Sequence, residues 1–270
     1  MNKTKIDWAD RTWNPVIGCL HDCQYCYARK IAHRFGGRWI QNTGKNKKQD
    51  DGNLRELGIP LPYQHKKGCL INAAYPFVFS LTFHRYRLGE PSKIKKPQNI
   101  FVCSMADLFG EWVPDEWIKA VFEACKKAPQ HRYLFLTKNP ERYYRLWDDI
   151  SIYIPNNFWL GATITNSTDR YFYSLDRMQN SFLSIEPIHE NLEGFDDIPS
   201  HRFPDWCIIG AETGNQEGKI IPKREWIENI IGVCRDNNIP VFMKNNLQDI
   251  WKEPLIQEYP WITAEAKEIV

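Results

Sequence analysis

The 270-residue sequence contains no apolar run of the roughly 18 to 20 residues that a membrane-spanning helix requires. Residues 1–7 also lack the apolar stretch that forms the centre of a signal peptide. Charge of one sign does not dominate, because 35 basic and 33 acidic side chains leave a formal net charge of +2. We therefore expect a cytoplasmic protein with no membrane segment, and the overall charge gives no argument for a polyanionic partner.

Cysteine is too sparse for a disulfide-stapled scaffold, with eight residues in the whole chain. Five of these lie scattered in or beside apolar runs, where a free cysteine packs as a small core residue. These five are Cys69, Cys103, Cys125, Cys207 and Cys234. The other three, Cys19, Cys23 and Cys26, fall within eight consecutive residues. That triplet is the candidate set of metal ligands.

Hydrophobic residues make up 43% of the chain and charged residues 25%, which is the composition of an ordinary globular protein. From residue 76 onward, short β-branched and aromatic runs alternate with helical patterns, which is typical of a parallel sheet covered by helices. The predicted strands are 77–82, 100–104, 133–137, 159–164, 182–186, 206–211 and 241–244, and the predicted helices are 114–127, 140–148, 169–179 and 224–237. A further strand at 12–17 brings the strand count to about eight and predicts a partial or complete parallel β/α barrel of the TIM-like type.

One domain over residues 1–270 accounts for this pattern. The segment at about 36–75 breaks the alternation and contains a polar stretch at 45–52, so we interpret it as an insertion with a surface loop. The stretch at about 246–270 is interpreted as a C-terminal cap.

In a parallel barrel, functional side chains lie at the carboxyl ends of the strands. Polar residues predicted there are Ser104, Asp107, Thr137, Lys138, Thr163, Thr165, Glu186, Glu212 and Lys244. A single polar residue in such a place often only caps a helix or forms a turn. Glu186 and Glu212 are more informative, because each follows an apolar run in which an unpartnered carboxylate is costly.

The triplet has the spacing C-x3-C-x2-C, and an aromatic residue, Tyr25, precedes the third cysteine. Two interpretations are open. A zinc site would need a fourth ligand, for which His21 is the nearest candidate. Three thiolates alone suit a 4Fe-4S cluster in which one iron remains open to a small molecule.

This spacing, on a loop after the first strand of an apparent barrel, resembles the radical S-adenosylmethionine superfamily. The resemblance implies a radical SAM barrel and a 4Fe-4S cluster bound by Cys19, Cys23 and Cys26. It also implies that S-adenosyl-L-methionine binds the open iron and is cleaved to a 5'-deoxyadenosyl radical, with Tyr25 beside the adenosyl group. An electron donor such as flavodoxin or ferredoxin would then be a partner.

Six motifs in order also resemble a family of uncharacterised radical-SAM-like proteins common in phages and bacterial mobile elements. The motifs occupy residues 6–15, 101–109, 136–142, 183–187, 209–214 and 241–244. The chain departs from that family in three ways. Its first two cysteines have the ordinary radical-enzyme gap, Ala211 replaces an expected glycine, and Asn245 replaces an expected glutamine.

The strand-end residues assigned to S-adenosylmethionine binding are Ser104, Thr137, Thr163, Glu186, Glu212 and Lys244, together with Tyr25. Helix capping and a structural Glu212–Lys244 pair are the alternatives. Trp8, Trp13, Trp39 and Trp112 are candidates either for base stacking or for packing. The family resemblance favours a nucleotide or nucleic-acid substrate. A peptide or small metabolite, or a non-catalytic zinc-stabilised nucleic-acid or protein-binding module, is the alternative. No catalytic residue is assigned.

Overall fold

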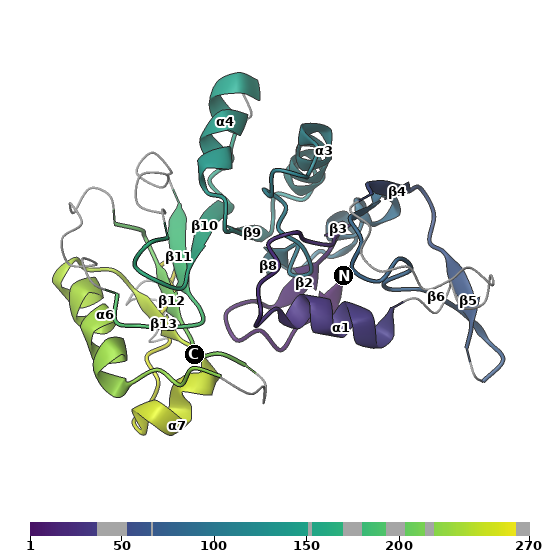
Figure 1. Ribbon diagram of the computed structural model, residues 1–270. Coiled ribbons are helices and arrows are strands. Elements are labelled where there is room, and N and C mark those ends of the chain that lie inside the picture. Colours follow the sequence, from purple (N-terminus) through teal and green to yellow (C-terminus); the bar gives the residue numbers. More distant parts are fainter. Residues whose placement is uncertain are drawn as a thin grey trace. The chain divides into compact units, whose positions relative to one another are not determined.

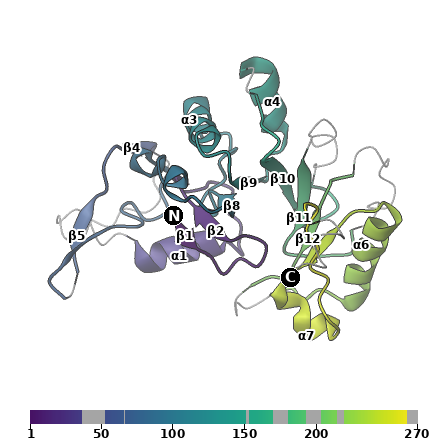
Figure 2. The ribbon, with the colours of Figure 1, turned by 180° about the vertical axis from the view of Figure 1, so that it is seen from behind.

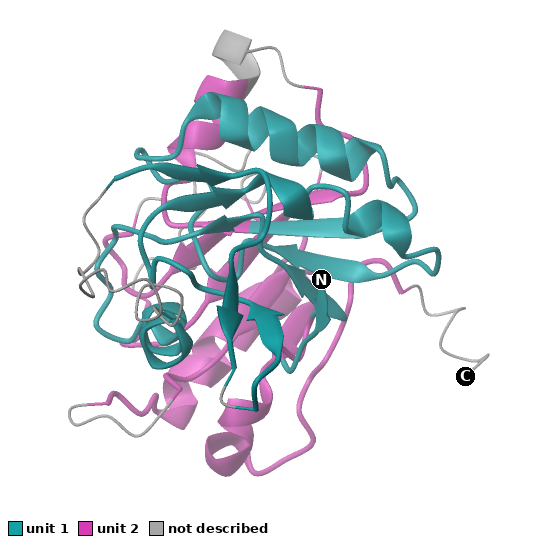
Figure 3. Ribbon diagram, turned by 90° about the vertical axis from the view of Figure 1, so that its right-hand side faces the viewer, with its two compact units in different colours: residues 1–5, 9–135 teal, residues 6–8, 136–270 magenta. Residues whose placement is uncertain are grey.

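The protein is described by a computed structural model, in which the chain divides into two compact units (Figure 3). Unit 1 comprises Met1–Lys5 and Ala9–Phe135, and unit 2 comprises Ile6–Trp8 and Leu136–Val270. The structure describes residues 1–36, 53–65, 67–150, 153–169, 180–192, 203–213 and 219–262. Within these ranges no helix is both long and apolar enough to span a bilayer.

Unit 1 is built on a mainly parallel set of strands (Figure 1). In spatial order these are β1 (Asn2–Lys3), β2 (Arg11–Trp13), β8 (Asn99–Val102) and β9 (Arg132–Thr137). β1 is antiparallel to β2, whereas β2 is parallel to β8 and β8 is parallel to β9. Helix α3 (Asp115–Lys126) connects β8 to β9, as a parallel crossover requires.

The sequence of α3 explains its bounds and its orientation. Pro114 occupies the N-cap, and two acidic residues lie in the first turn, where they interact favourably with the helix dipole. Trp117, Val121 and Cys125 recur every four residues on the buried face.

A smaller sheet in unit 1 carries the segment that leads into the cysteine loop. Its order is β3 (Val16–Ile17), β7 (Thr82–His84) and β4 (Arg55–Leu57). Two short 3-10 helices, η1 (Arg85–Arg87) and η2 (Pro91–Lys93), follow β7. A separate hairpin consists of β5 (Pro62–Gln64) and β6 (Leu70–Asn72), and β5 can be found in Figure 2.

Unit 2 contains four parallel strands and several helical segments. In spatial order the strands are β10 (Phe158–Ile164), β11 (Ser181–Ile185), β12 (Cys207–Ile209) and β13 (Val241–Met243). The helical segments are α4 (Glu141–Ile150), α6 (Arg224–Asp236), η4 (Asn245–Leu247) and α7 (Gln248–Trp251). Helix α6 connects β12 to β13, and Figures 1 and 2 both show it beside the strands. Cys234 on α6 and Cys207 on β12 are both fully buried.

Trp206 is the centre of the aromatic core of unit 2. It is fully buried, and its ring packs against Trp8, Phe182, Phe242 and Trp261 at centroid distances between 5.1 and 6.4 Å. Large aromatic rings in such edge and tilted arrangements supply much of the buried apolar area of a core.

The expected α/β architecture with mainly parallel strands is confirmed, whereas closure into a barrel stays a prediction, as do the single domain, the insertion at 36–75 and the cap at 246–270. Six of the eight expected strands are present within a few residues of their predicted bounds. The predicted strand at 77–82 is wrong, because residues 76–79 form a turn in which Val78 has a φ of 58°. The expected strand at 12–17 is interrupted at residues 14–15 and gives β2 and β3, which belong to different sheets. The predicted helix at 169–179 and the polar stretch at 45–52 lie almost entirely outside the described residues.

Candidate functional site

The three clustered cysteines lie on a loop of unit 1 between β3 and helix α1 (Tyr27–Phe35). Cys26 is the N-cap of α1, and its sulfur accepts a hydrogen bond from the Arg29 backbone N–H at 3.4 Å. The Cys26 backbone N–H donates in turn to the Cys23 carbonyl at 3.1 Å. The third cysteine of the motif therefore caps the helix that follows it directly.

Glycine is required where the loop leaves β3. Gly18 has a φ of 99°, and a Cβ added there would lie 2.6 Å from the Phe79 carbonyl oxygen. Its backbone N–H donates to the Met105 carbonyl at 3.0 Å, which ties the start of the loop to the turn after β8. Any side chain at this position would therefore push apart the two segments that hold Cys19 in place.

Asn14, which precedes β3, and Tyr27, which begins α1, both hydrogen-bond to the turn after β8. The Asn14 Oδ1 atom accepts hydrogen bonds from the Ser104 hydroxyl at 3.2 Å and from the Met105 N–H at 3.0 Å. The Tyr27 hydroxyl donates to the Ser104 carbonyl at 2.7 Å. Ser104 is thus part of the structural frame of the cysteine loop.

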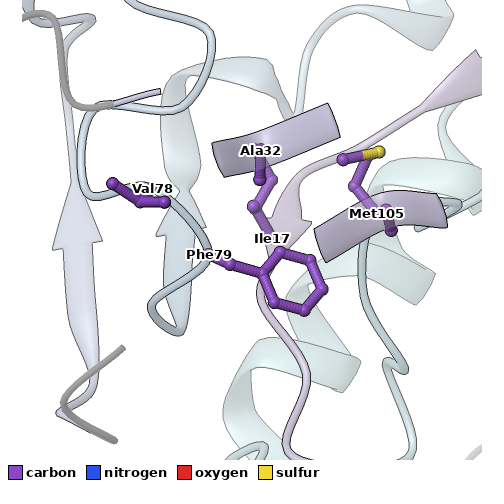
Figure 4. Packing of buried hydrophobic residues seen from close by; sticks show 6 residues of the cluster. Ile17, Ala32, Val78, Phe79 and Met105 are labelled. Atoms are coloured by element: carbon purple, nitrogen blue, oxygen red, sulfur yellow. The ribbon is translucent and has the colours of Figure 1, made fainter. Parts of the chain in front are cut away.

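The cysteine side chains are held at the margin of a small apolar core. Ile17, Ala32, Val78, Phe79 and Met105 are buried there (Figure 4), and Cys19 and Cys26 pack against that cluster. All three clustered cysteines are half-buried, so the core covers one side of the loop and leaves the thiols partly accessible.

Burial raises the pKa of the Cys19 thiol to about 12, although a hydrogen bond from the His21 backbone opposes the shift. The charge of Asp107 and of the other two thiols acts in the same direction as burial. The metal-free thiol is therefore protonated at neutral pH, and metal binding there must displace a proton.

Arg29 supplies positive charge to the loop. Its guanidinium donates to the Cys19 carbonyl at 3.4 Å, lies 3.3 Å from an Asp22 carboxylate oxygen and stacks over the Phe79 ring at 5.3 Å. These contacts join the loop to α1 and to the apolar core.

The donors of the loop are three thiols, a ligand set that suits a 4Fe-4S cluster with one open iron. Among the described residues, no three Cys, His, Asp or Glu side chains converge as ligands of one metal ion. Zinc would require four donors about 2.0 to 2.3 Å from a single ion. In a 4Fe-4S cluster each thiolate binds a different iron, so the three sulfurs need not converge on one point.

A second group of polar side chains lies at the carboxyl ends of β11, β12 and β13 in unit 2. Lys244 donates to the Glu186 carboxylate, and the Cβ of a residue at Gly210 would meet the Lys244 side chain at 2.9 Å. Glu212 is 8% exposed and lies 3.5 Å from the Nε2 atom of His189. The alternative Glu212–Lys244 pair is therefore wrong, because each of these side chains has a different partner.

Asn246 completes this second group. Its side chain accepts from the Ala211 N–H at 3.1 Å and donates to the Ala211 carbonyl at 2.6 Å. The two bonds connect the segment after β13 to the one after β12.

The remaining predicted cofactor residues have varied surroundings. The Thr137 hydroxyl is buried and accepts from the Asn139 N–H at 2.9 Å, which is the turn-forming role considered as its alternative. Thr163 is half-buried on β10, and Tyr25 is half-buried in the cysteine loop. Their roles as cofactor ligands stay predictions.

Two of the four tryptophans considered for base stacking are core residues. Trp8 is 2% exposed and Trp13 is fully buried. Trp112 packs edge-on against the His21 ring, and Trp39 lies outside the described residues.

Asn14, Tyr27, His189 and Asn246 have structural or site contacts that sequence reasoning missed. Asn14 falls within the conspicuous Trp-Asn-Pro segment, which was the available signal. For the others the partner is distant in sequence, and no local pattern marks them.

The family model described as "Protein of unknown function (DUF5131)" matches residues 3–253. The chain belongs to the DUF5131 family. No curated protein matches the sequence of this DUF5131 protein.

Among solved structures, the DUF5131 chain is similar to three variants of spore photoproduct lyase. A cysteine-to-serine mutant and a tyrosine-to-phenylalanine mutant each give 10% identity and a TM-score of 0.48. A double mutant with bound AdoMet and dinucleoside spore photoproduct gives 9% identity and a TM-score of 0.46. Each comparison covers 93% of this chain and 76% of the other.

Proposed function

We propose that this DUF5131 protein is a radical S-adenosylmethionine enzyme with a barrel of that type. The observation that carries the proposal is the C-x3-C-x2-C loop itself, with three half-buried thiols framed by Gly18 at one end and the N-terminus of α1 at the other. Cys19, Cys23 and Cys26 would hold the 4Fe-4S cluster. When bound, that cluster supplies the electron for reductive cleavage of the sulfonium of S-adenosylmethionine.

The surroundings of the loop suit that role. The apolar cluster around Phe79 excludes water from one side of Cys19, and burial of this kind helps to set the potential of an iron–sulfur centre. Arg29 and the first N–H groups of α1 place positive charge beside thiolates that carry negative charge. The protein thus favours the anionic ligand form once a proton has left Cys19.

We assign binding of the methionyl and ribose groups to side chains of unit 2. Glu186 and Glu212 supply carboxylates that can accept from an ammonium group or from ribose hydroxyls, and Lys244 can donate to a carboxylate. What supports the assignment is that Glu186, Glu212 and Lys244 all follow neighbouring parallel strands, where ligands of α/β sheets commonly bind. The further proposed contacts are Thr163, Thr137, Ser104 and Tyr25.

For the substrate we propose a nucleotide or nucleic acid, which is altered after hydrogen abstraction. The support is the resemblance of six sequence motifs to a phage- and mobile-element-associated family. A low-potential donor such as flavodoxin or ferredoxin would deliver the electron. A peptide or small metabolite as substrate is an outcome that the assay below can reveal.

The test is anaerobic incubation of the iron- and sulfide-loaded protein with S-adenosylmethionine and dithionite, followed by chromatography. We expect slow formation of 5'-deoxyadenosine and methionine without substrate, and faster formation with the right nucleotide, oligonucleotide or peptide. Cys23→Ala should abolish the products, whereas Cys69→Ala, which alters an exposed cysteine just before β6, should not. If the loaded protein gives no 5'-deoxyadenosine with several reductants and all substrate classes, the enzymatic function is refuted and the protein is a non-catalytic binding module.

A further inference from the structure

The His21 ring, inside the cysteine loop, is held by residues from the turn that follows β8. Its Nε2 atom lies 2.7 Å from the Asp107 Oδ2 atom, and the pair is largely buried, with side chains 23% and 8% exposed. The second carboxylate oxygen of Asp107 accepts the Phe109 N–H at 3.0 Å. Asp107 is therefore fixed by its own segment before it contacts the loop.

A tryptophan holds the same ring from another side. Trp112 packs edge-on against His21, with ring centroids 4.9 Å apart and planes at 77°. Gly110 allows this placement, because a Cβ there would lie 2.4 Å from the Trp112 ring. The histidine ring is thus confined by a carboxylate and an indole that are both distant in the sequence, 86 positions away in the case of Asp107.

The position of His21 connects this contact to the thiols. It lies two residues from Cys19 and two from Cys23, so its peptide groups belong to the short segment that carries both thiols. Fixing the His21 ring therefore fixes the peptide that orients Cys19, as partners around metal ligands commonly do.

We infer that Asp107 is a positioning residue for the cysteine loop, which through His21 and with Trp112 holds the Cys19–Cys23 segment in the conformation that receives the cluster. The inference depends on the proposed function for the identity of the cluster. The preorganised loop itself does not depend on it, and a metal-free experiment can examine it alone.

The first experiment measures the alkylation rate of each cysteine in the metal-free protein by mass spectrometry, with iodoacetamide under anaerobic conditions. Asp107→Ala should raise the rate at Cys19 by about tenfold or more, since it removes a hydrogen bond between groups that can carry charge. The exposed Cys69 should react at the same rate in every variant and serves as the internal reference.

Asp107→Asn separates positioning from charge. The introduced amide can keep both contacts, because its oxygen accepts from the Phe109 N–H and its NH2 group donates to the other tautomer of His21. We expect this variant to react at Cys19 much more like the wild type than Asp107→Ala does, although loss of the negative charge alone lowers the pKa of the thiol and slightly speeds alkylation. Equal effects of Asn and Ala would show that charge, not positioning, is responsible, and would overturn the inference. A wild-type rate in Asp107→Ala would overturn it as well.

Gly110→Ala gives an independent test from the tryptophan side. It should displace the Trp112 ring and increase Cys19 reactivity, whereas Gly89→Ala, at which an added Cβ meets nothing within 4 Å, should not. After loading with iron and sulfide, the reduced cluster of Asp107→Ala should also show altered electron paramagnetic resonance g-values that Asp107→Asn restores. If no cluster forms in any variant, including the wild type, the proposed function fails while the alkylation result still decides whether the loop is held.

Discussion

Substitution of Gly18 by alanine tests the structural frame of the cysteine loop most severely. The added Cβ would lie 2.6 Å from the backbone oxygen of Phe79 and 2.8 Å from the backbone nitrogen of Leu81. Backbone atoms cannot rotate away as the end of a side chain can. The φ of 99° adds strain of about 1 to 2 kcal/mol for a residue other than glycine. Loss of the hydrogen bond to Met105 adds about 1 kcal/mol.

The φ strain, the lost hydrogen bond and the backbone movement needed to remove the clash should together destabilise Gly18→Ala by about 3 kcal/mol or more. A change of that size lowers the melting temperature by roughly 6 to 12 °C in a chain of this length. Thermal unfolding followed by circular dichroism measures the shift, and the iron content after loading should fall with it because Cys19 adjoins the substituted residue.

Two other glycines provide matched controls. Gly68 also has a positive φ, 81°, but an added Cβ there meets nothing within 4 Å, so Gly68→Ala should show the conformational strain alone. Gly58 has neither feature, and Gly58→Ala should be nearly neutral. A melting temperature of Gly18→Ala no lower than that of Gly68→Ala would refute the reasoning, because close backbone contact would then have no effect.

Three further predictions follow from single side chains. Burial lowers the pKa of His84 from 6.5 to about 2, so the unfolded chain binds a proton below about pH 6.5 that the folded chain does not. Stability should fall as the pH drops through that window, by at most about 1.4 kcal/mol per pH unit from this group. Urea titrations at pH 6.5 and 4.5 should therefore show a smaller difference in unfolding free energy for His84→Gln than for the wild type. Glu212→Gln should weaken S-adenosylmethionine binding by about 1.5 to 3 kcal/mol in calorimetry with little loss of iron, and unchanged affinity would make Glu212 structural. Thr137→Val should lower the unfolding free energy by about 1 kcal/mol, because valine has no hydroxyl to accept the hydrogen bond from the Asn139 N–H. An additional loss of S-adenosylmethionine affinity would identify Thr137 as a ligand of the cofactor.

Local sequence patterns predicted the helices and strands whose bounds are set by residues within or next to the element itself. Helix α3 was expected at 114–127 and runs over Asp115–Lys126, because a proline at its start and a four-residue apolar repeat define both its beginning and its buried face. The parallel strands β9 to β13 were likewise visible as bounded β-branched and aromatic runs.

The failures occurred where tertiary packing determines the backbone. Residues 77–82 are apolar because Val78 and Phe79 are buried in the core around the cysteine loop, and a turn buries them as well as a strand would. Helix α1 was not predicted, although Cys26 caps it directly after the motif.

The candidate site divides in the same way. The spacing of the three cysteines identified them without a structure, since a compact triplet is a local signal. The partners of Glu186 and Glu212 could not be assigned from sequence, because no linear pattern shows which carboxylate Lys244 and His189 each contact. The contacts that orient the loop, from Asn14 to Ser104 and Met105 and from His21 to Asp107, join residues 86 to 91 positions apart.

The central claim, that the cysteine triplet holds a 4Fe-4S cluster, is tested most directly by the iron and sulfide content of the anaerobically purified protein. We expect about four irons and four sulfides per chain, together with a brown colour, in the wild type and in Cys69→Ala, and neither in Cys23→Ala. A colourless protein containing one zinc ion, or iron that Cys23→Ala and Cys69→Ala lose equally, would contradict the account.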